Sequence, residues 1–109
     1  MNHKHVGNIK LGPISSVHKR GDISFFIGEK DYWGMGLTTA SVKLVTQFAL
    51  SSLRLRKICG GCYSNNIGSQ MVFRKAGYSI EATRPSHSFS EGVWVDQIYF
   101  SKYGRSGRK

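Results

Sequence analysis

Long apolar runs, repeats and compositionally biased tracts are all missing from this sequence. No apolar stretch approaches the ~20 residues that cross a bilayer, and residues 1–10 contain no apolar signal-peptide core. Internal repeats and low-complexity segments are absent too. We therefore expect one globular domain in the cytoplasm, large enough at 109 residues to bury a core.

Cysteine is scarce, and the chain's two cysteines, Cys59 and Cys62, form a single CxxC pattern. A zinc site needs a second pair of ligands at matching spacing, and no other cysteine or suitably spaced histidine supplies one. A redox CxxC lies at a helix N-terminus, whereas residues 57–63 are predicted as a strand, on which residues three apart point to opposite faces. We expect a buried, reduced, structural pair and no metal site.

Acidic residues are also few, with six Asp and Glu against 16 Lys and Arg and a net charge of +10. This excess favours an anionic partner without selecting one, because nucleic acid, a phosphorylated cofactor and plain solubility all fit it. The basic residues are scattered and no helix-turn-helix, RNP or KH signature accompanies them, so nucleic acid is the least favoured partner. Residues 104–109 lack an apolar anchor, which predicts a flexible basic tail behind a domain of residues 1–103.

The most informative stretch runs from residue 21 to residue 53. Alternating apolar residues predict a strand over 22–29, and helical spacing predicts a helix over 36–53. The apolar face expected for that helix consists of Leu37, Ala40, Leu44, Val45, Phe48 and Ala49.

A glycine-containing turn, Trp33-Gly34-Met35-Gly36, connects the strand to the helix. Glycine permits close approach of the backbone to a ligand, and a helix N-terminus offers N–H groups and partial positive charge to an anion. The turn is therefore either a phosphate cradle over residues 33–38 or an ordinary strand–helix connection. It is not a P-loop, because no Gly-Lys-Ser/Thr follows, and Thr39 occupies the place of the third glycine in a dinucleotide fingerprint.

The rest of the chain alternates between short elements. Strands are expected over 5–11, 58–63, 78–82 and 93–100, with Gly12-Pro13 ending the first strand and polar loops over 15–20 and 83–90. A second helix follows the N-cap cluster at residues 64–66, with Gly77 just beyond its end. Trp94, Ile98 and Phe100 are expected on one face of the last strand, with Asp96 as a paired structural acid. This order predicts an α/β (α+β) domain with a mixed sheet flanked by helices.

A family resemblance rests on three motifs in order: the Trp33-Gly34-x-Gly36 turn into a helix, then Asn66-Ile67-Gly68-Ser69, and then Phe73-Arg74-Lys75-Ala76-Gly77-Tyr78. Together they resemble the GNAT superfamily of acetyl-CoA-dependent N-acetyltransferases, and within it the branch of ribosomal-protein and amino-sugar acetyltransferases. The resemblance covers residues 5–103. It implies acetyl-CoA as co-substrate and a GNAT-like sheet flanked by helices.

The resemblance also implies roles for single residues. The strand 25–29 would splay from its neighbour and pair with the pantetheine arm, and Asn66 would bind the cofactor near the thioester. Ser69 would protonate the departing thiolate, since Phe73 stands where many members have a tyrosine acid. The implied cofactor-binding set is Phe26, Ile27, Gly28, Trp33, Gly34, Met35, Gly36, Leu37, Thr38, Asn66, Ser69, Phe73 and Lys75.

The reaction so implied is direct attack of a neutral amine on a thioester, for which Asp22 and Glu29 are the candidate bases. For each of them, a solvated strand-end charge is the favoured interpretation over a catalytic base. Two features depart from the family pattern. Asp31 places an anion near the phosphates, and the family's first strand and two acceptor-binding helices have no counterpart before residue 5.

Two functions therefore stay open. The first is an N-acetyltransferase acting on a small-molecule or N-terminal amine, assembled as a homo-oligomer through an exposed N-terminal sheet edge. The alternative is a catalytically incompetent GNAT-like module that binds CoA or a partner. Turnover separates them.

Overall fold

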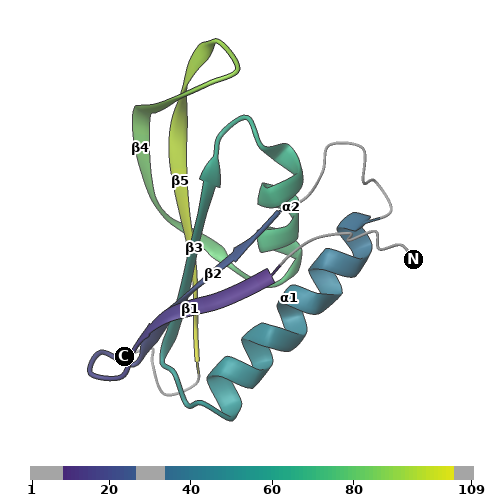
Figure 1. Cartoon of the computed structure of the whole chain (residues 1–109), viewed down its shortest axis with the longest axis vertical. Helices are drawn as coiled ribbons and strands as arrows, with labels where there is room; N and C mark the ends of the chain where they lie inside the picture. The colour runs from purple at the N-terminus through teal and green to yellow at the C-terminus, as the bar shows by residue number, and fades with distance from the viewer. Residues whose placement is uncertain (1–8, 27–33, 105–109) are drawn as a thin grey trace.

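The computed structural model describes residues 9–26 and 34–104, and Figure 1 shows their arrangement. The elements are β1 (Ile9–Ser15), β2 (Arg20–Phe25), α1 (Gly34–Ser51), β3 (Lys57–Tyr63), α2 (Ile67–Lys75), β4 (Ser79–Ser90) and β5 (Val93–Tyr103). They form one five-stranded sheet in the order β1-β2-β3-β5-β4. Only β2 and β3 run parallel, and the other neighbours are antiparallel. The predicted mixed sheet with helices is confirmed.

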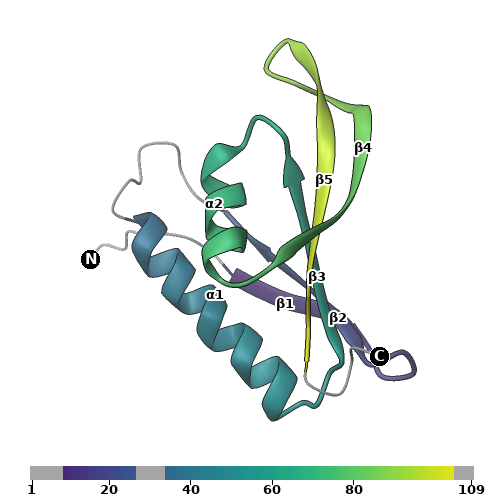
Figure 2. The same cartoon turned by 180° about the vertical axis from the view of Figure 1, so that it is seen from behind.

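Both helices pack on the same side of the sheet (Figures 1 and 2). Val42 of α1 and Val72 of α2 share one buried cluster with Ile23, Ile58 and Phe100 of the central strands. Side chains alternate between the two faces of a strand, so the neighbouring residues of β2 and β3 point to the face without described helices. The core therefore lies between one face of the sheet and the two helices.

Phe73 of α2 is the centre of this core. Its ring lies 4.9 Å from that of Phe25 and stacks on that of Phe100 at 4.6 Å. The ring also lies flat against β3 at Gly60, where an added Cβ would come within 2.6 Å of the Phe73 Cζ. Gly60 is therefore required for packing, because a side chain there would displace the ring.

The buried face of α1 differs from the prediction. Leu37, Leu44 and Phe48 were expected inside, but they are 58%, 69% and 52% exposed. Both stripes of the helix have the required three-and-four spacing, so periodicity alone does not choose between them. The sheet takes the stripe of smaller side chains, which permits close packing, and the Thr46 hydroxyl is satisfied by the Tyr78 hydroxyl at 2.7 Å. The buried positions are Thr38, Val42, Thr46 and Ala49.

Both edge strands extend further along the chain than predicted. β1 continues through Gly12-Pro13 with a shift of register between Leu11 and Ile14, and an edge position tolerates proline because one side needs no partner. Residues 83–90, predicted as a loop, belong to β4, which pairs with β5 across a second irregularity. Every residue of β4 up to His87 is exposed, so its polar composition concealed a strand.

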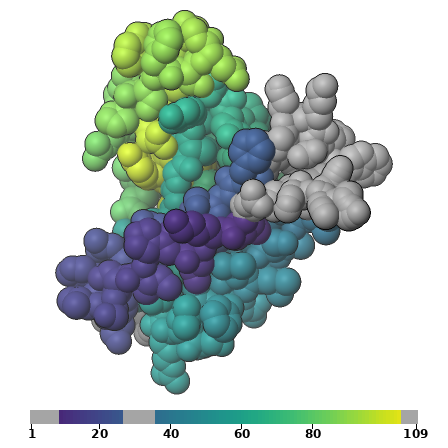
Figure 3. Space-filling model, in the orientation of Figure 1, coloured from purple at the N-terminus to yellow at the C-terminus, as the bar shows by residue number. Residues whose placement is uncertain are grey.

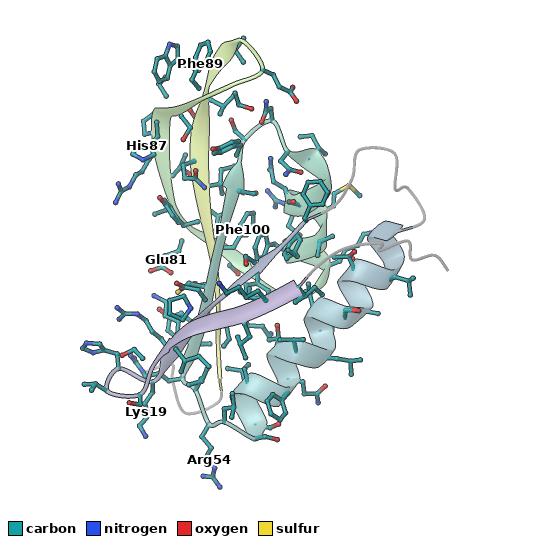
Figure 4. The ribbon with its side chains drawn as sticks, viewed as in Figure 1. Lys19, Arg54, Glu81, His87, Phe89 and Phe100 are labelled. Carbon is teal, nitrogen blue, oxygen red and sulfur yellow. The ribbon has the colours of Figure 1, made fainter. Side chains whose placement is uncertain are left out.

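The hairpin of β4 and β5 stands at one end of the molecule, with α1 towards the other end (Figure 3). Glu91 and Gly92 form its turn as predicted, both with positive φ. Trp94 is 64% exposed and packs edge-on against Phe89 at the hairpin's tip, so it does not join Ile98 and Phe100 in the core (Figure 4).

Gly104, the first residue of the predicted tail, donates its N–H to the Arg56 carbonyl at 2.9 Å. Residues 105–109 lie outside the described residues, so the flexible tail stays a prediction. Within the described ranges, neither helix has the length and apolar character needed to cross a membrane.

Candidate active site

The start of α1 is the first part of the candidate site. The helix begins at Gly34, and N–H groups in a first turn have no carbonyl partner within their own helix. Gly36 lies in this turn, and a Cβ built there would meet no heavy atom of the described residues within 4 Å. Neither a positive φ nor tight packing therefore requires glycine at this position. The missing side chain leaves space beside exposed helix-end N–H groups, as an anion cradle needs.

The second part of the candidate site is the place where β2 and β3 separate from each other. Their parallel pairing covers only residues 20–22 of β2 against residues 57–59 of β3. Beyond this point β2 stays paired with β1 and β3 stays paired with β5. Within the described ranges, the backbone N–H and C=O groups with which β2 and β3 face each other beyond this point are thus not hydrogen-bonded to each other. Such a separation offers an extended ligand a backbone edge.

The N-terminus of α2 contributes Asn66 and Ser69. Asn66 caps the helix, since its Oδ1 accepts the Ser69 N–H at 3.0 Å. A bond from the Asn66 side chain to a ligand would therefore use its NH₂ group as donor. Ser69 is only 4% exposed. A ligand must therefore reach below the protein surface to contact its hydroxyl group.

Ser64 anchors this end of α2 to the sheet. Its N–H donates to the Asp96 carbonyl at 2.8 Å, and its Oγ accepts the Asp96 N–H at 2.9 Å. Its carbonyl accepts the Gln70 amide at 2.8 Å, which ties the first turn of the helix to the same point. The Asp96 carboxylate accepts the Ser86 N–H at 3.0 Å and so links β4 as well. Asp96 is thus a hydrogen-bonded structural acid, as predicted.

The remaining predicted residues are dispersed. Phe73 is buried in the core described above, and Lys75 is exposed in the last turn of α2. Phe26 is exposed at the end of β2. Asp22 lies on the opposite face of the sheet from the helices, because its neighbours Gly21 and Ile23 are buried against them. The structure therefore does not bring Asp22 to Ser69.

Several predictions lie outside the described residues, namely those for Ile27, Gly28, Glu29, Asp31 and Trp33. Gly34 and Met35 are described only as the beginning of α1.

The two cysteines are free thiols on opposite faces of β3. Cys62 is buried and Cys59 half-buried. Burial raises the pKa of both thiols, that of Cys62 to about 11, so both are protonated at neutral pH. The described part of the chain contains no group of three or more His, Cys, Asp or Glu able to hold a metal ion.

Sequence reasoning missed two interactions. Besides the Ser64–Asp96 anchor, Lys57 and Glu81 form an ion pair of 2.8 Å on the sheet face without described helices. The hydrogen bond between them raises the pKa of Lys57 and lowers that of Glu81. Ser64 was recognised only as part of a cap cluster, and its partner lies 32 residues away. No local pattern signals a partner at that distance.

Comparison with known proteins gives a consistent picture. The sequence profile of the Acetyltransferase (GNAT) domain matches residues 1–79. The Bacillus subtilis protein named Probable N-acetyltransferase YjcK is 35% identical over 74 residues, which are 68% of this chain and 40% of that protein. The Escherichia coli Spermidine N(1)-acetyltransferase is 28% identical over 92 residues, covering 84% of this chain and 49% of its own length.

The fold is similar to that of solved acetyltransferases. The crystal structure of ribosomal-protein-S5-alanine acetyltransferase from Vibrio fischeri superposes with a TM-score of 0.80 at 20% identity, covering 98% of this chain and 58% of that one. The chain thus spans about half the length of the curated relatives it matches.

Proposed function

The chain belongs to the GNAT acetyltransferase family, and from this we propose that it binds acetyl-CoA and transfers the acetyl group to a primary amine. One observation carries the proposal. β2 and β3 separate towards the C-terminal end of β2, after which the chain continues into α1. The first turn of α1 has free space where a side chain at Gly36 would lie. An extended arm with a pyrophosphate at one end fits this combination, since the parted strands offer backbone groups and the helix end offers N–H groups.

When bound, acetyl-CoA supplies an activated acetyl group as a thioester. The first-turn N–H groups of α1 bind and orient the phosphates, with the helix dipole favouring their charge. Asp31, which lies outside the described residues, adds an anion to this region of the sequence, and Lys30 beside it in sequence is the nearest cation to offset it.

Asn66 and Ser69 are the residues we assign to the reacting end. The Asn66 NH₂ donates to the carbonyl oxygen on which negative charge develops, while its Oδ1 stays engaged in capping. Ser69 donates its hydroxyl proton to the departing sulfur and regains a proton from water. The amine gives its proton to water or to a carboxylate, and Glu29 is the remaining candidate base because Asp22 lies on the other face of the sheet.

The acceptor is proposed to be a primary amine of modest positive charge. The relatives' names include a spermidine acetyltransferase and a ribosomal-protein acetyltransferase, so a small polyamine and a protein N-terminus are both candidate acceptors. The net charge of +10 repels a polycation and slows its encounter with the protein. We therefore favour an N-terminal or singly charged amine over a polyamine.

Self-association through β1 forms part of the proposal. β1 is an edge strand in the described sheet, paired with β2 on one side. An open edge is a template for pairing with a second strand, and a second copy is the simplest source of one. Sedimentation of the purified chain tests this, since a monomer at all concentrations contradicts it.

Binding and turnover test the main proposal separately. Calorimetric titration with acetyl-CoA, using ATP as the charge-matched control, should show saturable binding that is clearly stronger for acetyl-CoA. Thiol release during a screen of amines should then reveal turnover, which Ser69→Ala should reduce without a comparable loss of acetyl-CoA affinity. Binding without turnover for any amine supports the alternative, a catalytically incompetent CoA-binding module. Equal binding of both ligands contradicts the cofactor site itself.

A further inference from the structure

Within the described residues, the two helices carry charge of one sign. α1 and α2 contain Lys43, Arg74 and Lys75 but no aspartate or glutamate. The acidic residues of the described ranges lie elsewhere: Asp22 on the other face of the sheet, Glu81 against Lys57, Glu91 in the hairpin turn, and Asp96 bonded to β4. An anion approaching the helices therefore meets attraction with no carboxylate on either helix to oppose it.

A groove of about 770 Å³ opens on this side. It lies between the C-terminal half of α1, the end of α2 and the C-terminal end of β5. The C-terminal ends of α1 and β5 lie at the foot of Figure 1. Its volume is within the range of small-molecule sites. Lys43 and Lys102 line it, together with Gln47, Ser51 and an apolar floor at Leu50 and Ala76, and none of its described lining residues is acidic.

Lys102 is held in position at the groove. Its Nζ lies 3.0 Å from the place that a Cβ on Gly77 would occupy, directly beyond the C-terminus of α2. The carbonyl end of a helix attracts a cation, so the ammonium group is drawn to this point. Lys102 is half-buried and Lys43 is exposed, so fewer conformations are open to the Lys102 side chain than to that of Lys43. A pair of this kind can close on a phosphate without ordering two long side chains at once.

We propose that this groove binds a phosphorylated small molecule carrying at least two negative charges. Lys43 and Lys102 pair with its phosphate oxygens, the Gln47 amide adds a neutral donor, and Leu50 with Ala76 accommodates an apolar part. The site is distinct from the acetyl-CoA site proposed above. Along α1, Lys43 is about 10 Å and Ser51 about 22 Å from Gly36 at a rise of ~1.5 Å per residue.

The test is a titration of the full 109-residue chain with inorganic pyrophosphate, followed through its amide NMR resonances. The resonances of Gln47, Ser51 and Gly104 should shift saturably. The double variant Lys43→Gln with Lys102→Gln should raise the Kd read from these resonances by about tenfold, and Lys43→Gln alone by about threefold. Lys10→Gln removes one positive charge from exposed β1, away from the groove, and should change this Kd by less than about twofold.

Several results would overturn the proposal. Equal weakening by Lys10→Gln, or loss of all shifts at about 0.15 M salt, would mean that only net charge attracts the anion. Shifts confined to Gly36–Thr38 would place the anion at the α1 N-terminus alone, a result that supports the acetyl-CoA site while removing this one. A single-stranded oligonucleotide that shifts resonances along both helices, where pyrophosphate shifts none, would replace the small molecule by nucleic acid.

If Lys102→Gln disturbs folding, the single variant Lys43→Gln still tests the proposal. Lys43 is an exposed helix residue outside the buried cluster, so its replacement leaves the core intact. An unchanged amide spectrum with an unchanged pyrophosphate Kd in this variant would contradict the proposal on its own.

Discussion

Replacing Gly36 by alanine separates two explanations for a glycine in the first turn of α1. The position has no positive φ, and an added Cβ has no heavy atom within 4 Å. Alanine should therefore be accommodated without a clash. Because alanine favours the helix and restricts the unfolded chain, the substitution should raise the free energy of unfolding by about 0.5 kcal/mol.

The same substitution should weaken acetyl-CoA binding. If the phosphates lie against the first-turn N–H groups, the new methyl group occupies their space and forces the ligand away. Losing one hydrogen bond to a charged group costs about 1.5–3 kcal/mol, or roughly tenfold to hundredfold in Kd. The variant should thus be more stable and bind more weakly.

Urea denaturation and calorimetric titration with acetyl-CoA measure these two effects. Leu44→Ala is the matched control, because it places alanine at an exposed position on the same helix. It should leave the acetyl-CoA Kd within about twofold of the wild-type value. Unchanged affinity in Gly36→Ala, together with the expected stabilisation, would refute the placement of phosphates at this turn. A loss of stability would refute the open space itself.

Three further predictions concern stability. Gly60→Ala should lower the free energy of unfolding by about 1–3 kcal/mol, since its Cβ would stand 2.6 Å from the Phe73 ring and 2.9 Å from the Ile23 carbonyl. Urea denaturation measures this, and a free energy of unfolding that is unchanged, or raised as expected for Gly36→Ala, would contradict the packing. Ser64→Ala should cost about 1–3 kcal/mol because it removes the acceptor of the Asp96 N–H, whereas Ser52→Ala, at an exposed position, should cost far less. Glu81→Gln should cost about 0.2–1 kcal/mol at neutral pH, as expected of a solvent-exposed ion pair. The folded pKa of Glu81 is lowered from 4.5, so this stabilisation is present above pH 4.5 and is lost as the pH falls through the folded pKa. The free energies of unfolding of the wild type and Glu81→Gln should therefore converge in acid. A difference between them that is independent of pH would show that the pair does not stabilise the fold.

Features set by short-range interactions were predictable from the sequence. Asn66 caps α2 because its side chain reaches an N–H three residues on, and Gly77 ends the helix because its φ of +92° suits glycine. Glu91-Gly92 forms a hairpin turn for similarly local reasons. The element order and the motifs that resemble the GNAT family are also linear in the chain. The structure confirms the order of the elements, and the family profile confirms the family.

Other features depend on partners that are distant in sequence. α1 has two stripes of suitable spacing, and only its packing against the sheet decides that Val42 is buried while Leu44 is exposed. The strand at residues 83–90 exists because β5 pairs with it, although its own side chains carry no strand signal. The parting of β2 and β3 likewise follows from each strand's pairing with its other neighbour.

The candidate site combines both kinds of information. By itself, the sequence determined which residues are candidates for holding a cofactor, because the glycine turn and the Asn66–Ser69 motif are local patterns. Only the tertiary structure decided which of them come together. It buried Phe73 in the core, placed Asp22 on the other face of the sheet and tied Ser64 to Asp96. The physical reason is that burial and pairing minimise the free energy of the whole chain, so the position of one side chain depends on residues that its own segment does not contain.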